Sequence, residues 1–119
     1  MVEFDSLTPS NGSVNIDETA FVNSIELVFD GAVKIDPGTI TLTPNTGNAQ
    51  SFDITEASEV TITNSDTFTL LGANLLDSIT YTVTYALTDT SDNVIAVPTI
   101  EFTTQTVLSS STPLNGTTN

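Results

Sequence analysis

Residues 80–85 read Thr-Tyr-Thr-Val-Thr-Tyr, and this stretch decides the fold. Its large apolar side chains recur at every second position, so they share one face of an extended strand, while the threonines share the other. Aromatic and β-branched residues suit a strand that is buried on one side. The stretch therefore predicts a long strand that packs Tyr81, Val83 and Tyr85 against a core.

The same alternation recurs on both sides of that strand. Residues 24–29 place Ile25, Leu27 and Phe29 on one face, and residues 39–43 alternate Thr with Ile and Leu. We expect further strands at residues 2–7, around Phe52 and Ile54, in a hairpin over 59–71, and at Ile100 and Phe102, with apolar contacts from Val14, Ile16, Val33 and Ile35. No segment shows a period of 3.6. The prediction is an all-β fold, a β-sandwich of about seven strands in two antiparallel sheets with Greek-key connections.

Composition narrows the class of protein. A chain of 119 residues supports one domain with a modest core. Its net charge of −14, from 15 acids against Lys34 alone, repels nucleic acid and anionic lipid. A hydrophobic content of 38% argues against an acidic disordered tail. No apolar stretch approaches the roughly 18 residues of a membrane span, so we expect no direct membrane insertion.

The chain lacks the residue types that enzymes most often use for catalysis. The chain has no His and no Cys, the commonest general base and the best thiol nucleophile. Paired carboxylates of the kind that hydrolyse glycosides would have to come from Asp17 and Glu18 or from Asp89 and Asp92, and nothing places them across a sugar. No Gly-rich phosphate loop is present. We therefore expect no enzymatic activity.

A short sequence motif, here called the phrase, occurs twice in the chain. Residues 109–119 repeat residues 5–15 at an offset of 104, with six of the eleven positions identical, including the core Thr-Pro-x-Asn-Gly. Self-similarity at a fixed period indicates a tandem array. We predict one repeat over residues 1–106, followed in 107–119 by a linker and the start of the next repeat. The partners would be neighbouring copies in the same chain, the phrase would form the joint between them, and the isolated domain would be monomeric.

Several short sequence motifs, taken in their order along the chain, resemble those of a known family. They are Thr-Pro-x-Asn-Gly at residues 8–12, Ile-Glu-Leu-Val-Phe at 25–29, Val-x-x-Asp-Pro-Gly-Thr-Ile at 33–40, Tyr-Thr-Val at 81–83, Leu-Thr-Asp at 87–89 with Asp-Asn at 92–93, and Phe-Thr-Thr at 102–104. Together they are similar to the bacterial Ig-like domains of S-layer proteins and long surface adhesins. Two departures add acid: Asp77-Ser78 stands where that family often has Pro-Gly, and Asp92 where it often has Gly.

The resemblance carries implications for function. It implies a bacterial cell-surface or secreted, hence extracellular, sandwich that serves as a structural extender and has no catalytic residues. It also makes Tyr81 a candidate tyrosine corner, whose hydroxyl would bond backbone near Leu75 to Asp77. The alternative is that Tyr81 is only a core aromatic.

The acids are expected at the two ends of the sandwich. Loops of a seven-stranded sandwich alternate between its ends, which would gather Asp5, Asp30, Asp36, Asp89, Asp92 and Asn93 at an N-terminal pole and Asp17, Glu18 and Asp77 at the opposite pole. Two acidic poles that meet should repel unless a cation lies between them. We therefore predict Ca²⁺, which prefers oxygen ligands, at the junctions between repeats. Two alternatives remain: Lys34 neutralises Asp30 or Asp36 directly, or the charge only keeps the array soluble.

The runner-up function is an adhesive module that binds carbohydrate, protein or ice. Thr-x-Thr runs occur at residues 39–43, 61–63, 67–69 and 80–84, and flat threonine arrays can order water. Outward threonines are also ordinary on the solvent side of strands, and these runs should be divided between two twisted sheets. A ligand-binding repeat would be expected to expose aromatic residues in loops, whereas the Phe and Tyr residues here fall mostly at inward positions.

Overall fold

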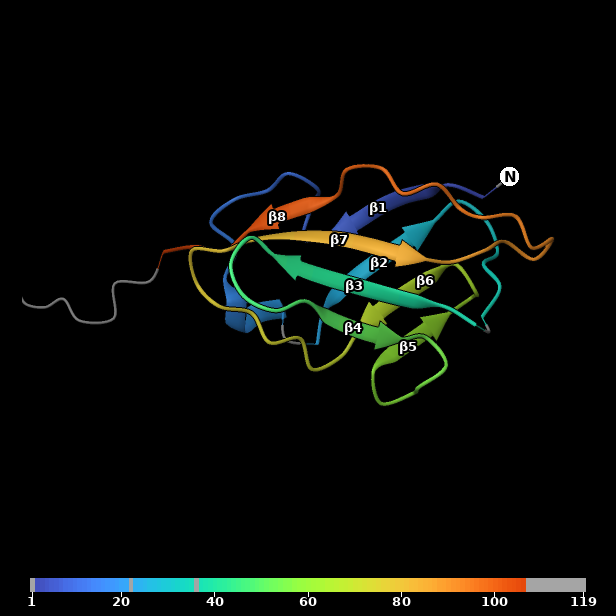
Figure 1. Cartoon of the computed structure of the whole chain (residues 1–119), viewed down its shortest axis with the longest axis horizontal. Helices are drawn as coiled ribbons and strands as arrows, with labels where there is room; N and C mark the ends of the chain where they lie inside the picture. The colour runs from blue at the N-terminus through green and yellow to red at the C-terminus, as the bar shows by residue number, and fades with distance from the viewer. Residues whose placement is uncertain (1, 22, 36, 107–119) are drawn as a thin grey trace, which may run out of the picture.

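The computed structural model describes residues 2–21, 23–35 and 37–106. Its strands are β1 (Phe4–Thr8), β2 (Ile25–Phe29), β3 (Thr39–Pro44), β4 (Gln50–Asp53), β5 (Val60–Thr63), β6 (Thr67–Leu70), β7 (Thr80–Ala86) and β8 (Glu101–Thr103), with one 3₁₀ helix, η1 (Glu18–Phe21). Figure 1 shows two layers. Within the described residues, no helix has the length and apolarity needed to cross a membrane.

The strand order is that of an Ig-type sandwich. One sheet runs β1-β2-β6-β5 and the other β4-β3-β7-β8, and every pair is antiparallel. The β2–β3, β4–β5 and β6–β7 connections each pass from one sheet to the other, as in Greek-key sandwiches. The all-β sandwich prediction is confirmed, with eight strands in the described part of the chain where the alternation indicated about seven.

The core lies between the sheets and follows the predicted alternation. Ile25, Leu27 and Phe29 of β2 are buried in turn, while the residues between them are half-buried. Phe29 is at the centre: its ring meets those of Phe4, Phe68 and Tyr85 edge to face at centroid distances of 5.9, 5.7 and 5.2 Å. Such edge-to-face pairs add to the stabilisation that apolar burial already supplies.

The duplicated phrase has a different place from the one expected. After the cis Thr8–Pro9 bond the chain leaves β2 and runs beside β8 in the other sheet, with Gly12 N–H donating to the Glu101 carbonyl and Ile16 bridging Thr104 in parallel. The Asn11 side chain fixes this crossing, since its amide donates to the Thr99 carbonyl at 3.0 Å and its oxygen accepts from Glu101 N–H at 2.9 Å. Interpreting residues 8–12 as the joint between repeats was therefore wrong: they move the first strand from one sheet to the other inside the unit.

Two of the four expected loop contacts with the core are also wrong. Val33 is 1% exposed and Ile16 is half-buried, as predicted, but Val14 and Ile35 are 62% and 50% exposed. Ile16 and Val33 each take part in an isolated bridge, not in a ladder. A single bridge orients only one residue toward the core, so the alternation does not extend to the residue two positions away.

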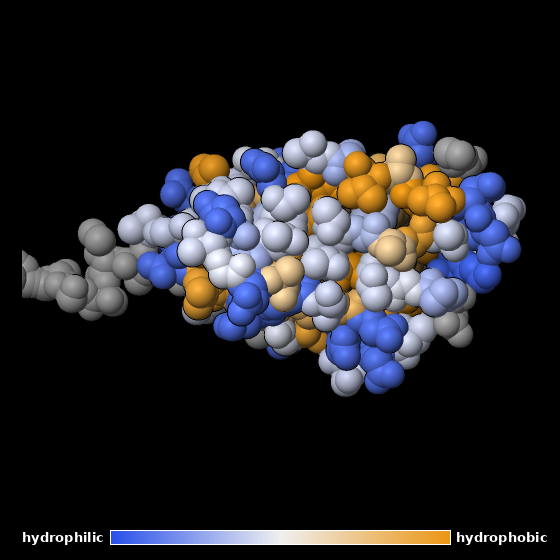
Figure 2. Space-filling view, viewed as in Figure 1, coloured by the Kyte–Doolittle hydropathy of each residue, from blue (hydrophilic) through white to orange (hydrophobic). Residues whose placement is uncertain are grey.

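The four Thr runs form two paired sets. Thr41 faces Thr84 and Thr43 faces Thr82 across β3 and β7, whereas the runs at 61–63 and 67–69 face each other across β5 and β6 in the other sheet. The predicted division between two sheets is therefore present, with two runs in each. In Figure 2 the face over β3 and β7 is pale, neither strongly hydrophilic nor strongly hydrophobic.

Candidate functional site

The N-terminal pole, the end of the sandwich where the chain enters, brings together four segments. Asp30 N–H donates to the Glu3 carbonyl at 3.0 Å, which joins the entering chain to the loop after β2. In the same loop, Val33 N–H donates to the Ser65 carbonyl and Lys34 N–H to the Thr88 carbonyl. The loop after β7 thus meets the loop after β2, as the topology predicted, and the β5–β6 turn joins them. In Figure 2 hydrophilic side chains gather at this right-hand end.

The acids predicted at this pole do not converge. Asp30 accepts a hydrogen bond from the backbone N–H of Glu3 at 2.8 Å, so its carboxylate already secures the entering chain. Asp5 is exposed on β1. Asp36 lies outside the described residues.

Asp89 organises the loop after β7. The residue is 6% exposed, and its carboxylate accepts from the N–H groups of Ser91 at 2.8 Å and Asn93 at 3.0 Å, and from the Asn93 side-chain amide at 3.4 Å. The Asn93 N–H is the main cause that lowers the Asp89 pKa, and the Ser91 N–H adds to it while desolvation opposes both. Asp89 and Asn93, both predicted as Ca²⁺ ligands, are here bonded to each other in a loop that they hold together.

Lys34 forms an ion pair with Asp92, which was not among the acids proposed for it; of those two, Asp36 lies outside the described residues. Its ammonium lies 2.6 Å from the Asp92 carboxylate, and not at Asp30, which binds the Glu3 N–H. The two side chains are 42% and 71% exposed, so the pair contributes about 0–1 kcal/mol to stability. Its effect on charge is local, because it neutralises one acid of the pole.

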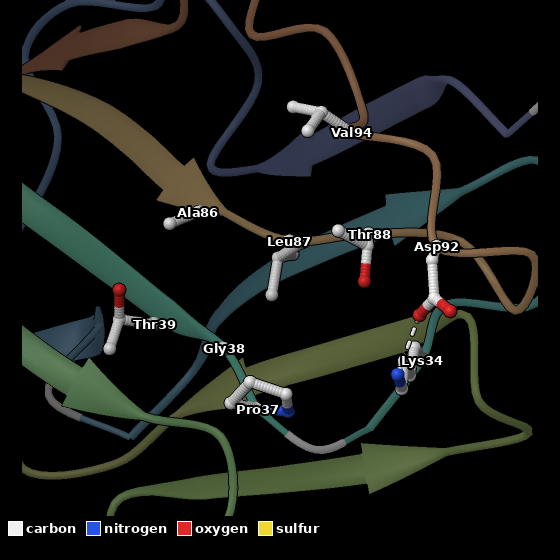
Figure 3. A pocket seen from close by; sticks show the side chains of 9 residues that line it. All are labelled: Lys34, Pro37, Gly38, Thr39, Ala86, Leu87, Thr88, Asp92 and Val94. Atoms are coloured by element: carbon white, nitrogen blue, oxygen red, sulfur yellow. Dashed lines mark hydrogen bonds and ion pairs between the residues drawn. The ribbon is translucent and has the colours of Figure 1, made fainter.

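Beside this ion pair lies an apolar hollow of about 490 Å³. It is bounded by the start of β3 and the end of β7, and Figure 3 shows Val94 and Asp92 above it and Pro37 below. Its lining consists of Lys34, Pro37, Gly38, Thr39, Ala86, Leu87, Thr88, Asp92 and Val94. The sequence did not indicate this feature, because its walls come from segments about 50 residues apart and only the register of β3 against β7 brings them together.

The opposite end, the C-terminal pole, is built around a tyrosine hydroxyl. Tyr81 is 1% exposed, and its hydroxyl accepts a hydrogen bond from Leu76 N–H at 2.7 Å, which confirms the predicted tyrosine corner. Thr104 completes the arrangement: its hydroxyl donates to the Leu76 carbonyl at 2.6 Å and accepts from Ile79 N–H at 2.9 Å. The loop before β7 is thus tied to the strand by which the chain leaves.

The acids of the C-terminal pole have separate surroundings. Asp17 accepts from the hydroxyl and the N–H of Thr19 at 2.7 and 3.0 Å at the start of η1, and these bonds, the hydroxyl first, lower its pKa. Asp77 is exposed and follows Leu76 in the corner loop. The side chain of Glu18 lies outside what the structure describes.

Ca²⁺ needs six to eight oxygen ligands that converge on one point. Within the described part of the chain, no three acidic side chains of a single unit are grouped closely enough to hold a metal ion. Asp17, Asp30, Asp89 and Asp92 each accept a hydrogen bond or an ion pair inside the unit. The acids that the structure describes therefore form no such cluster within one unit.

Comparison with known proteins agrees with this architecture. The sequence matches the family described as bacterial Ig-like domain over residues 2–104. Among solved structures, the crystal structure of CopC from Methylosinus trichosporium OB3b is similar, with a TM-score of 0.65 and 16% identity over 88% of this chain and 94% of that one. At that identity the likeness concerns the fold. A search of curated proteins gives no match. The match over residues 2–104 covers nearly the whole sandwich, and the chain belongs to the bacterial Ig-like domain family.

Proposed function

We propose that this domain is a structural extender repeat of a large bacterial cell-surface adhesin or S-layer-type protein, which projects a distal binding domain away from the cell. The observation that carries the proposal is the path of the chain. Glu3 enters beside Asp30 at one pole, and Gln105 leaves beside Ile16 and Ser78 at the other. A domain entered and left at opposite ends adds its own length to a chain.

The repeat in the sequence supports a tandem arrangement. The phrase at residues 8–12 switches the first strand between sheets, and the same phrase at 112–116 would do so in the next unit. One unit would then occupy residues 1–106, and the next would begin in 107–119. Copies of the unit are the partners, and the setting is extracellular, on the bacterial surface or secreted.

The mechanism is mechanical, not catalytic. Strands run between the two poles in Figure 1, and the seven residues of β7 span about 24 Å. Each unit would add that length and its loops, and the high negative charge would keep the array from aggregating. All eight aromatic residues, six Phe and two Tyr, are buried or half-buried, which favours an extender over a module that binds its ligand with exposed rings.

Ca²⁺ at the junction remains part of the proposal. Asp77 at one pole and Asp5 at the other are exposed carboxylates that two units in series would bring toward each other. Ligands shared by two units would stiffen the junction and offset the repulsion between the poles. Melting a two-unit chain in EDTA and again in excess Ca²⁺ tests this: a higher melting temperature in Ca²⁺ supports a junction ion, and superimposable curves reject it.

Small-angle X-ray scattering tests the extender role. Chains of one, two and three units should show a maximum dimension that rises by a constant increment per unit. A two-unit chain whose maximum dimension barely exceeds that of one unit has its domains side by side, and that result would reject the role.

A second candidate, binding of an ordered surface such as ice, has one observation in its favour. Thr41 with Thr84 and Thr43 with Thr82 form successive rungs on the outer face of one sheet. Strand twist works against a flat array, and for that reason the extender role is preferred. An ice-recrystallisation assay at micromolar protein separates the two functions, because clear inhibition would favour the binding module.

A further inference from the structure

The chain is held firmly up to the point where it leaves the domain. Gln105 N–H donates to the Ile16 carbonyl at 2.8 Å, and the Gln105 carbonyl accepts from Ser78 N–H at 3.0 Å. One residue later, the Thr106 hydroxyl is hydrogen-bonded to that of Ser78 at 2.7 Å. The last residues of the unit therefore belong to the folded domain.

At the other end the chain is held from its first described residue. Glu3 N–H donates to the Asp30 carboxylate at 2.8 Å, and the Glu3 carbonyl accepts from Asp30 N–H at 3.0 Å. Val2 packs against the core, with a methyl group 3.1 Å from where a Cβ on Gly31 would lie. The chain is thus hydrogen-bonded to the domain both where it enters, at the N-terminal pole, and where it leaves, at the C-terminal pole.

The offset of 104 residues joins these two ends almost without a gap. Adding 104 to Val2 gives Thr106, and adding 104 to Glu3 gives Val107. Gln105 is held by backbone hydrogen bonds at the end of one unit, and Glu3 is held in the same way at the start of the next. Gln105 would therefore precede the equivalent of Glu3 by two positions. Two residues span at most about 7 Å. A junction that short brings the two poles into contact.

Leu76 is an exposed apolar residue at the exit. Leu76 is 56% exposed, although both of its backbone groups are bonded, the N–H to the Tyr81 hydroxyl and the carbonyl to the Thr104 hydroxyl. Its position is therefore fixed next to the strand by which the chain leaves. Across the junction, Gly31 lies next to the entering Val2 and is followed by the exposed Ala32, and neither residue carries a side chain larger than a methyl group.

We propose that Leu76 of each unit docks on the next unit, against the surface formed by Gly31 and Ala32 at its N-terminal pole. This inference rests on the proposed function and specifies its junction: consecutive units are in direct apolar contact, with one residue between their anchored backbones. The contact removes Leu76 from water and resists the repulsion between acidic poles. It requires no cation, so it should persist in EDTA.

The test uses a two-unit chain in which residues 1–106 are followed directly by residues 3–119. Backbone ¹⁵N relaxation in EDTA measures the rotational correlation time of each unit. We expect both units to tumble as one body, and four Gly-Ser residues inserted after Thr106 to shift each unit toward the correlation time of a single-unit chain. Leu76→Ser in the first unit should shift the two-unit chain in the same direction.

Val94→Ser in the first unit is the matched control, because Val94 is 75% exposed at the pole that faces away from the junction. It should leave the correlation time unchanged. If Leu76→Ser lowers the stability of the single-unit chain, Ala32→Asp in the second unit replaces it and should uncouple the units from the other side. The inference is overturned if the unmodified two-unit chain tumbles like the Gly-Ser variant, or if neither substitution differs from Val94→Ser. If the maximum dimension measured by small-angle X-ray scattering still rises by a constant increment per unit, the extender role would then hold without this contact.

Discussion

Replacing Tyr81 with Phe removes one hydroxyl and should weaken the whole domain. The ring would remain stacked on Phe102, at a centroid distance of 5.6 Å, so core packing is preserved. What is lost is the acceptor for Leu76 N–H, bonded at 2.7 Å. A buried donor left without a partner costs about 1–3 kcal/mol. Because the Leu76 side chain is 56% exposed, water can partly replace the hydroxyl, and we expect a loss of about 1–2 kcal/mol.

Thermal and urea unfolding of the single-unit chain measure this loss. For a domain of about 100 residues, each kcal/mol lowers Tm by roughly 4–8 °C. Tyr85→Phe is the control, since the Tyr85 hydroxyl donates to the carbonyl of Ala96, an exposed residue whose carbonyl water can reach. That change should cost under about 1 kcal/mol. A Tyr81→Phe chain as stable as the unmodified one, or a larger loss in Tyr85→Phe, would contradict the assignment of the corner as a structural tie.

Three further predictions concern other parts of the domain. Burial raises the pKa of Tyr85 to about 12, above the ordinary phenol value near 10, so its contribution to stability is complete below pH 10 and is lost as the pH rises toward 12. Phenolate absorbance should show a step near 12, and its absence would refute the burial. Hydrogen bonds lower the Asp89 pKa, so its contribution is present above pH 3.8 and is lost as the pH falls through the folded-state value. Asp89→Asn should therefore be less stable than the parent at pH 6, with a difference that narrows in acid, and a constant difference would show that the charge is not involved. Gly38→Ala would place a Cβ 2.6 Å from Leu87 and 2.8 Å from Ile54, and should cost about 1–3 kcal/mol in urea unfolding, whereas an unchanged midpoint would mean that the side chains move aside freely.

The fold could be predicted from the sequence because the burial of one face of a strand determines its pattern of apolar residues. In β2 and β7 one face is buried along the whole strand, so every second residue had to be apolar. Tyr81 could be assigned a role only through the resemblance to a family, because alternation alone cannot distinguish a corner tyrosine from a core one.

The hydrogen bonds of individual side chains could not be predicted from the sequence pattern. Asn11 belongs to a Thr-Pro-x-Asn-Gly phrase that resembles an ordinary turn, yet its amide attaches the crossing segment to β8, about 90 residues away in the chain. Asp89 resembles a solvated loop acid, yet it is nearly buried and its carboxylate binds the N–H groups of Ser91 and Asn93 in its own loop. Charge and loop order predicted which acids share a pole, but could not show that most of them are already engaged.

A crystal structure of the two-unit chain, grown with Ca²⁺, tests the central claim most directly. The account predicts units arranged end to end, with the exit pole of the first against the entry pole of the second and Leu76 of the first beside Gly31 and Ala32 of the second. Any junction ion would be visible between carboxylates of the two units. Units packed side by side, or poles separated by solvent with Leu76 still exposed, would contradict it.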